Sequence, residues 1–432
     1  MKVVSVTSTV PYDAVPHAGG RYVASLYAVL RDGEVSLTVL SHDSPSSQQA
    51  RRSEGAPSNL VLIGDGPRSA WSGLPLAVCR AVRSRMGSAR HVVPDFELGA
   101  ELFFHPRMRQ ALREADLIDI QWEISGRLLP IIRAVARRTP TVVTFHDVDS
   151  QRWQRKAAAA SGLKRVLLRG AVRHMRRAER RIGRLADRCA VLNGKDAALL
   201  KEVGVDPNKI VVVNPVIDMR RARDRSAPEP GLVLLVSYLA RYENVEGALW
   251  FLREVWPLVR RRRPEAVFRL VGGGAPAELR EAVRDVPGVE ATGYVEDLQE
   301  QYARAAVCVV PLFKGAGVKF KTLEALMAGV PVVTTAVGAE GIGGPELFAG
   351  LTSDPQVFAD AVCEALSEVV GADDGSAPPD APVRRRTAEA AKTLTATYSP
   401  EAFRSTLARL YGLEGAGACV APGEGRREEG DQ

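Results

Sequence analysis

Short apolar runs of strand length alternate with longer, mixed stretches along most of the 432 residues. In the first half these runs are VVSVTS, VSLTVL, NLVLIG, DLIDI, TVVTF and CAVLN, and in the second half LVLLVS, AVFRLV, GVEATGY, VCVVPL and VPVVTT. Apolar strands separated by helical stretches are typical of parallel sheets covered on both faces. The pattern predicts an α/β protein with two Rossmann-like, doubly wound domains that face an interdomain cleft.

A polar segment at residues 218–231, containing RRARDRSAPEP, separates the two series of strands. We expect an N-terminal domain over residues 1–217 and a second domain over residues 218–398. A helix at about 399–413 is expected to complete the first domain, and the Gly-, Glu- and Arg-rich residues 414–432 are predicted to be disordered. Helices of the second domain are predicted at 245–263, 277–284, 298–305 and near 321–328.

Composition excludes several classes of protein. Hydrophobic residues make up 46% and charged residues 25%, which excludes a disordered, collagen-like or coiled-coil chain. No apolar run reaches 18 residues, and the N-terminus resembles a buried strand rather than a secretory leader, so a cytoplasmic location is expected. The five cysteines lie far apart without a C-x-x-C pair, which favours buried free thiols over a disulfide or a zinc site.

The net charge of +7 is concentrated in residues 151–188, which hold thirteen Lys or Arg residues and only two acidic ones, Glu179 and Asp187. Apolar residues recur there at near-helical spacing, so the segment predicts a basic helix with one face packed inward. The charged face is either simply solvated or a peripheral contact with anionic lipid at the inner face of the membrane. Nucleic acid is disfavoured, because Trp153 is the lone aromatic residue among these charges.

Residues 311–342 form the most informative stretch, PLFKGAGVKFKTLEALMAGVPVVTTAVGAEGI, which predicts a strand, a glycine-rich loop, a helix and a second strand. Glycines and a helix start favour a bound diphosphate, to which Lys319 and Lys321 would add positive charge. The Glu324 carboxylate could accept hydrogen bonds from two vicinal ribose hydroxyls. A surface ion pair between Lys321 and Glu324 is the simpler alternative. A dehydrogenase is disfavoured, since neither first βα turn carries G-x-G-x-x-G.

Several motifs occur in the same order as in a known family. They are Gly19-Gly20, Phe145-His146-Asp147 after TVVT, GYV at 293–295, LEALMAGVPVV at 323–333 and GAEG at 338–341. With these motifs the chain resembles a retaining, nucleotide-sugar-dependent glycosyltransferase of group 1 (family 4), which has the GT-B fold.

The resemblance implies roles for individual residues. Gly19 and Gly20 would approach the donor phosphate, His146 would lie beside the transferred sugar, the backbone at Val295 would read the base, and Glu324 would bind ribose. The catalytic residues expected are His146, Lys319 and Lys321. The donor-binding residues expected are Gly19, Gly20, Arg241, Asn244, Gly273, Val295, Gly317, Lys319, Lys321, Thr322 and Glu324.

Three positions depart from the family pattern. Ala316 stands where a Glu is usual, and Tyr238 and Asn244 stand where an Arg and a Lys are usual. Our hypothesis is that Lys319 and Lys321, together with Arg241, replace the missing cations. The departures also leave open a catalytically impaired protein that acts as a binding partner.

Neither a metal nor another cofactor is expected. Asp147-Val148-Asp149 spells D-x-D, which holds a divalent metal in the other main transferase fold, but two wound domains argue against that fold. The acceptor would meet residues 45–58 and 69–104, and it could be a glycan, a lipid-linked precursor or a small natural product. A nucleotide-sugar epimerase or a phosphorylase on the same two-domain plan is a further alternative.

Overall fold

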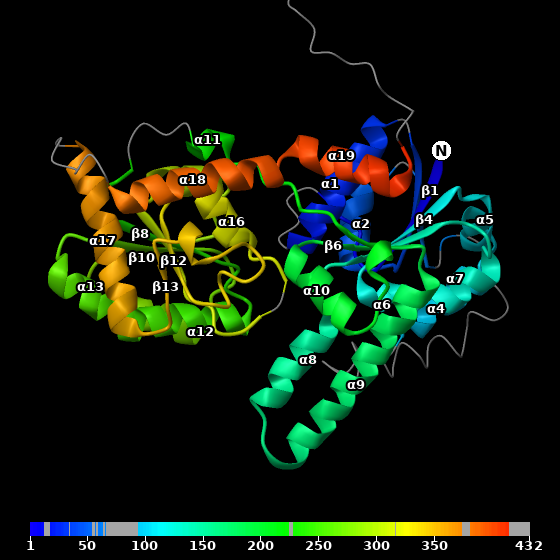
Figure 1. Ribbon diagram of the computed structural model, residues 1–432, viewed down its shortest axis with the longest axis horizontal. Helices are drawn as coiled ribbons and strands as arrows, with labels where there is room; N and C mark the ends of the chain where they lie inside the picture. Colours follow the sequence, from blue (N-terminus) through cyan, green and yellow to red (C-terminus); the bar gives the residue numbers. More distant parts are fainter. Residues whose placement is uncertain are drawn as a thin grey trace, which may run out of the picture.

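Two α/β domains make up the molecule, and one pair of helices projects away from both of them (Figure 1). The computed structural model describes residues 1–12, 18–33, 35–53, 57, 59–63, 65, 94–223, 228–315, 317–373 and 381–413. Residues 414–432, for which disorder is predicted, lie outside the described residues. The predicted fold, two Rossmann-like domains with parallel sheets, is confirmed.

The first sheet has seven parallel strands in the order β3-β2-β1-β4-β5-β6-β7. Apolar side chains alternate between its faces, so that Val3 belongs to one buried cluster and Val4 to the other. The order reverses between β1 and β4, which is where doubly wound sheets bind ligands. The strands are β1 (Lys2–Thr7), β2 (Ser36–Ser41), β3 (Asn59–Leu62), β4 (Leu117–Gln121), β5 (Thr141–Phe145), β6 (Arg188–Val191) and β7 (Ile210–Val212).

Helices cover both faces of this sheet, and the last of them comes from the C-terminal end of the described chain. Phe403 and Leu407 of α19 (Pro400–Tyr411) are buried in one cluster with Leu26 of α1. Tyr411 Oη also donates a hydrogen bond of 2.8 Å to the buried carboxylate of Asp119. The other helices of this domain are α1 (Ala18–Asp32), α2 (Pro45–Arg52), α4 (Phe96–Phe104), α5 (Pro106–Glu114), α6 (Glu123–Gly126), α7 (Leu129–Val135) and α10 (Gly194–Glu202).

The second sheet has six strands in the order β10-β9-β8-β11-β12-β13, again with a reversal, here between β8 and β11. The predicted helix at 245–263 is continuous but contains a π-helical turn (Phe251–Val255). The strands are β8 (Leu232–Val236), β9 (Val267–Val271), β10 (Val289–Gly293), β11 (Val307–Val310), β12 (Val332–Thr334) and β13 (Gly350–Leu351). The helices are α11 (Arg220–Arg223), α12 (Tyr242–Trp250), α13 (Trp256–Arg262), α14 (Ala277–Arg284), α15 (Leu298–Arg304), α16 (Phe320–Met327), α17 (Pro355–Asp373) and α18 (Pro382–Thr397).

The prediction of a single basic helix over residues 151–188 is wrong. The segment forms two helices, α8 (Asp149–Ala158) and α9 (Gly162–Leu185), which pack against each other as a hairpin (Figure 1). The chain turns at Gly162, whose φ of 56° is accessible to glycine at little cost. The prediction that one face of this segment packs inward is confirmed in part. Met175 and Ile182 are buried, but Leu167 is 67% exposed.

Free thiols are found at three of the five cysteines. Cys189, Cys308 and Cys363 are unpaired and buried, as predicted, while Cys79 and Cys419 lie outside the described residues. None of the helices that the structure describes is both long enough and apolar enough to cross a membrane.

Candidate active site

The predicted site residues come from loops at the carboxyl ends of the strands in both sheets. His146 follows β5, while Lys319 and Lys321 lie at the start of α16, after β11. These two loops meet where the domains contact each other, and we call this contact region the seam. The seam therefore combines the ligand-binding edges of both doubly wound domains.

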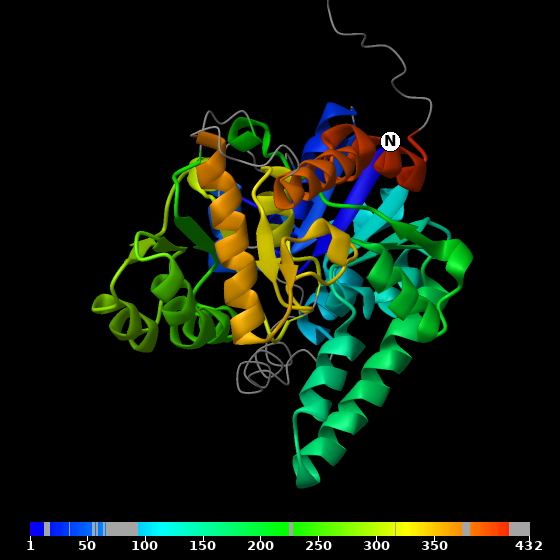
Figure 2. The same ribbon diagram turned by 60° about the vertical axis from the view of Figure 1, so that its left-hand side comes forward.

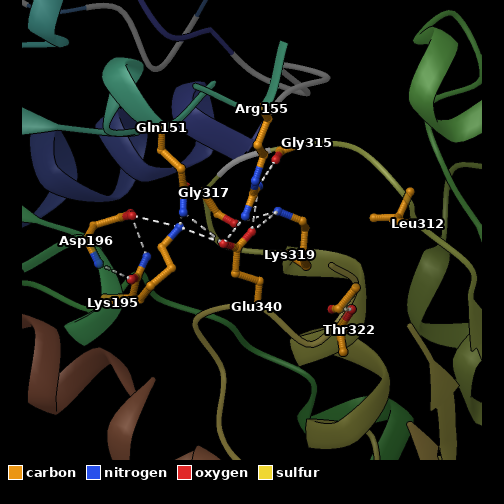
Figure 3. A network of polar contacts seen from close by, with 12 residues as sticks. Gln151, Arg155, Lys195, Asp196, Leu312, Gly315, Gly317, Lys319, Thr322 and Glu340 are labelled. Carbon is orange, nitrogen blue, oxygen red and sulfur yellow. Dashed lines mark hydrogen bonds and ion pairs between the residues drawn. The ribbon is translucent and has the colours of Figure 1, made fainter. Parts of the chain in front are cut away.

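A carboxylate of the second domain, Glu340 in the GAEG motif, holds the seam together (Figure 3). Its oxygens accept hydrogen bonds from Arg155, with one Nη–O distance of 3.0 Å, and from Gln151 at 3.2 Å. Lys195 Nζ lies 3.4 Å and Lys319 Nζ 3.8 Å from the same carboxylate. Burial acts to raise the pKa of Glu340, but the Arg155 hydrogen bonds and the neighbouring lysines together lower it below its ordinary value.

Gly317 brings the two loops into direct contact. Its φ is 72°, and a Cβ atom built on it would lie 1.9 Å from Asp147 Oδ1. No other residue type would fit, because a side chain would strain the backbone and collide with a carboxylate. Arg155 also donates a hydrogen bond to the Gly315 carbonyl, so the glycine-rich loop is fixed from the first domain.

Lys321 is half-buried, and its ammonium group lies between the end of β8 and helix α12 of the second domain. Its Nζ donates to Ser237 Oγ, just after β8, and lies 2.8 Å from Asn244 Oδ1 in α12. Asn244 in turn donates to the Tyr238 carbonyl at 2.7 Å. Burial lowers the pKa of Lys321 to about 7, and the nearby charges of Lys319 and Arg241 contribute to this shift while Cys308 and Glu324 oppose it.

Lys319 is the second cation of this loop and faces the seam. Only 7% of its surface is exposed, and its Nζ donates to the Gly317 carbonyl at 2.7 Å. Burial lowers its pKa to about 8, although Glu340 and Asp147 oppose that shift. The buried Lys319 and the half-buried Lys321 thus form a cationic pair beside a helix start, an arrangement that an anion would stabilise.

Glu324, the expected ribose ligand, contacts a residue of the first domain. Arg21 Nη1 of α1 lies 2.7 Å from Glu324 Oε1, and Tyr302 Oη donates to the other oxygen at 3.3 Å. The Arg21 guanidinium also lies 5.1 Å from the centre of the Phe320 ring. The simpler alternative, an ion pair between Lys321 and Glu324, is absent from the ion pairs of the described residues.

His146 is held by neighbours on three sides. Its ring stacks on Trp122 at 4.2 Å, meets Tyr22 edge-on at 5.2 Å, and places Nε2 2.9 Å from Gln121 Oε1. Gln121 Nε2 lies 2.8 and 2.9 Å from the two oxygens of Asp119, so the amide oxygen must face the histidine. His146 Nε2 therefore carries the proton, and when the ring is neutral its Nδ1 is the acceptor atom. A Cβ on Gly19 would lie 3.2 Å from Nδ1, so the first turn of α1 approaches this nitrogen closely.

The remaining residues predicted to bind the donor either lie at the edge of the site or contact other parts of the fold. Thr322 is buried and donates to the Gly338 carbonyl at 2.9 Å, which joins α16 to the GAEG loop. Arg241 is exposed, and Val295 packs against the core of the second domain. The other predicted positions are Gly20, buried in the first turn of α1, Gly273, whose added Cβ would lie 3.5 Å from Tyr294, and Ala316, which lies outside the described residues.

Both carboxylates of the D-x-D pattern contact Arg152. Asp149 Oδ1 lies 2.8 Å and Asp147 Oδ2 3.4 Å from Arg152 Nη2. Within the described part of the chain, no group of three or more His, Cys, Asp or Glu side chains is arranged to hold a metal ion.

Five residues with clear contacts at the site were missed from sequence. Sequence signals existed for two of them, since Glu340 lies within the quoted GAEG motif and Arg155 lies within the basic segment. The others act through long-range contacts that no local pattern reveals. The residues are Arg21, Gln121, Arg155, Ser237 and Glu340.

Two wound domains thus meet at a seam that carries a glycine-rich, cationic loop, and family models specify the class of protein. Residues 232–368 match the model of glycosyl transferases group 1, and residues 19–221 match that of glycosyltransferase family 4. The chain belongs to the group 1 (family 4) glycosyltransferases.

Solved structures share the whole two-domain fold. HepE of Anabaena, in complex with UDP and glucose, has a TM-score of 0.64 at 14% identity, covering 95% of this chain and 99% of HepE. Sucrose-phosphate synthase from Thermosynechococcus elongatus has a TM-score of 0.61 at 18% identity, covering 95% and 98% of the two chains. At these identities the likeness concerns the GT-B fold.

A relative in Klebsiella pneumoniae, described as an uncharacterized 44.6 kDa protein in the cps region, is 30% identical over 150 residues. The match covers 32% of this chain and 38% of the relative, so it spans well under half of either protein.

The contact between Gly317 and Asp147 predicts that Gly317→Ala lowers glycosyltransferase kcat/KM by tenfold or more. The added methyl group would strain a positive φ and push the loop away from the His146-Asp147 turn. Gly170→Ala is the matched control, because a Cβ on Gly170 of α9 meets no atom within 4 Å. Equal kcat/KM for the two variants would contradict this role for the loop.

The hydrogen bond from His146 to Gln121 predicts that Gln121→Leu lowers kcat about tenfold with little change in the KM for the donor. The variant keeps the side-chain volume but removes the acceptor that selects the histidine tautomer. Kinetics and thermal unfolding are measured together, since leucine also leaves Asp119 without one donor. A rise in donor KM with unchanged kcat would assign Gln121 to donor binding instead.

Proposed function

We propose that the protein transfers a sugar from a nucleoside diphosphate sugar to an acceptor hydroxyl, with retention of configuration at the anomeric carbon. The observation that carries this proposal is the pair formed by the buried Lys319 and the half-buried Lys321, beside a glycine-rich loop and the start of α16. Two neighbouring cations that are largely removed from water and have lowered pKa values are a costly arrangement without an anion, and a diphosphate offers the matching charge. HepE, which shares the fold, is known in complex with UDP and with UDP-glucose, and this is consistent with such a donor.

In this proposal the protein acts by positioning and electrostatics. Lys319 and Lys321 stabilise the charge that develops on the departing diphosphate, and the amides at Gly19 and Gly20 approach it from the first turn of α1. His146, fixed by Gln121 and Trp122, borders the transferred sugar. The departing phosphate takes the proton of the acceptor hydroxyl as the new glycosidic bond forms on the same face, so no protein nucleophile is needed.

The unusual Asn244 has a function in this arrangement. Its amide oxygen lies 2.8 Å from Lys321 Nζ, so a lysine from α16 occupies the place next to the position that usually carries the cation. We infer that Lys321 supplies the missing charge and that Asn244 and Ser237 orient it. A lysine at residue 244 would instead place two ammonium groups in contact and raise the electrostatic cost.

The reaction is proposed to proceed without a metal or other cofactor. Asp147 and Asp149, the candidate metal ligands, both face Arg152, whose charge would compete with a cation. Full activity after treatment with a chelator is expected.

For the biological role we propose assembly of a cell-envelope or exopolysaccharide glycan, with a natural-product acceptor as the alternative. Support for the first comes from the partial match to a protein of a cps region. A catalytically impaired binding partner is the second candidate function, and the ion pair between Arg21 and Glu324, which occupies the expected ribose ligand, favours it. Such a protein would bind the donor and release no nucleoside diphosphate with any acceptor.

A thermal-shift screen with nucleoside diphosphate sugars tests the donor. A bound donor at a hundred times its Kd stabilises the fold by about 2.7 kcal/mol, which raises the Tm measurably. The best donor is then incubated with candidate acceptors, and NMR of the product reports the anomeric configuration. Absence of stabilisation by every donor would overturn the proposed function, and an inverted product would overturn retention.

The lysine pKa values predict that nucleoside diphosphate affinity falls as the pH rises. Lysine is a cation below its pKa, so Lys321 gains charge below about pH 7 and Lys319 below about pH 8, where the diphosphate binds best. Calorimetry with Lys321→Met should show a flatter pH dependence, and Lys319→Ala with Lys321→Ala should lower kcat/KM at least tenfold. Lys314→Met is the control, because Lys314 is an exposed lysine just after the same strand. A wild-type Kd that is independent of pH would remove the lysines from the donor site.

A further inference from the structure

The α8–α9 hairpin is the most prominent projection of the described chain. It extends away from both domains, and its connecting turn lies far from either sheet in both views (Figures 1 and 2). Each helix packs mainly on the other. The far end of the arm adds little to either core, so its outer surface is available for contact with another molecule.

The end of this arm exposes three large apolar side chains beside Lys164 and Arg165. Leu163 is 75%, Val166 62% and Leu167 67% exposed, and Leu163 is the most exposed large hydrophobic side chain among the described residues. Positions i, i+3 and i+4 lie on one side of a helix, so these three side chains form a single patch. We call this patch the apolar tip. Exposed clusters of this kind mark contact sites with membranes or other molecules.

The same side of α9 becomes strongly cationic toward the body of the protein. Arg173, Arg177 and Arg181 follow at helical spacing and are all exposed. The one acidic residue of α9, Glu179, is buried and accepts a hydrogen bond of 2.8 Å from the Ser150 amide. The outward face therefore combines an apolar end with a row of positive charges and presents no acidic side chain.

The base of the hairpin is joined to the candidate active site. Helix α8 begins at Asp149, three residues after His146, and its Gln151 and Arg155 contact Glu340 across the seam. Glu179 fixes α9 to the first turn of α8. The element that carries the tip thus also contacts the seam at its base.

We propose that the α8–α9 hairpin docks the protein on an anionic lipid bilayer, with the apolar tip inserted at the boundary between headgroups and acyl chains. The arginines of α9 bind the anionic headgroups, which combines two signals for stable peripheral attachment. A second copy of this chain is a poorer occupant, since each copy carries a net charge of +7 and the arms would repel. Resting on the proposed function, the inference also assigns the acceptor to the class of membrane-borne glycan precursors.

Flotation of the full-length protein with lipid vesicles tests the docking. Wild-type protein is expected to float with vesicles of phosphatidylcholine and phosphatidylglycerol and to remain free of vesicles of phosphatidylcholine alone. Replacing Leu163, Val166 and Leu167 together by Ser should lower the partition coefficient at least tenfold. Replacing Arg173, Arg177 and Arg181 by Gln should lower it roughly fivefold per residue, with a weaker dependence on salt.

Matched controls lie on the second domain. Val357→Ser on α17 pairs with Val166→Ser, because Val357 is 53% and Val166 62% exposed. Replacing Arg261, Arg280 and Arg284 by Gln removes three exposed charges elsewhere and pairs with the arginine variant of α9. Thermal unfolding is measured for every variant, and binding to anionic vesicles by both control variants is expected to equal that of the wild type.

The proposal is overturned if wild-type protein does not bind anionic vesicles, or if the tip variant binds as well as the wild type. It is also overturned if light scattering shows a wild-type oligomer that the tip variant dissociates, since the tip would then contact another copy. Vesicle binding needs neither donor nor acceptor. A protein that floats but binds no nucleoside diphosphate would overturn the proposed function alone, and one that binds the donor but not vesicles would overturn the docking alone.

Discussion

The Glu340 carboxylate is the interaction on which the arrangement of the site depends. It lies among Arg155 of α8, Lys195 of α10 and Lys319 of the glycine-rich loop, so it joins the base of the hairpin, the first domain and the candidate donor loop. Charges that are partly removed from water interact more strongly than surface pairs, provided that each has a partner. Loss of this carboxylate would leave several cations facing one another across the seam, which would weaken the contact between the domains.

Balance of charge also explains why the lysines suit a diphosphate. Lys321 is satisfied by two neutral oxygen atoms, Ser237 Oγ and Asn244 Oδ1, which orient its ammonium group without neutralising it. Its pKa is lowered to about 7 because these neutral oxygens do not compensate the cation for the water that it has lost. A diphosphate would raise the pKa of Lys321 by placing negative charge beside it, so diphosphate binding and protonation of Lys321 are coupled.

The strand–loop–helix–strand unit at residues 311–342 and the family itself could be predicted from sequence, because local patterns encode both. The glycine-rich loop, α16 and β12 occur as expected, and so does the cationic character of the loop. The partners of these residues could not be predicted, since Arg21 and Glu324 are 303 positions apart and Lys321 and Ser237 are 84 positions apart. The prediction of one helix in place of the hairpin is wrong for a different reason. The Ser161-Gly162 pair is a turn signal, but the basic residues continue at helical spacing on both sides of it.

If Glu324 binds ribose as proposed, the donor competes with Arg21 for the same carboxylate. A carboxylate that already accepts a guanidinium and the Tyr302 hydroxyl has limited capacity for two ribose hydroxyls. If Glu324 binds ribose, Arg21 must move, and since Arg21 belongs to α1 this movement is linked to the first turn that carries Gly19 and Gly20. The described conformation is therefore closed by protein contacts that a donor would have to replace. Binding of the sugar nucleotide would break the ion pair between Arg21 and Glu324 and would join the two domains through the ligand instead. Domain closure would then depend on the substrate.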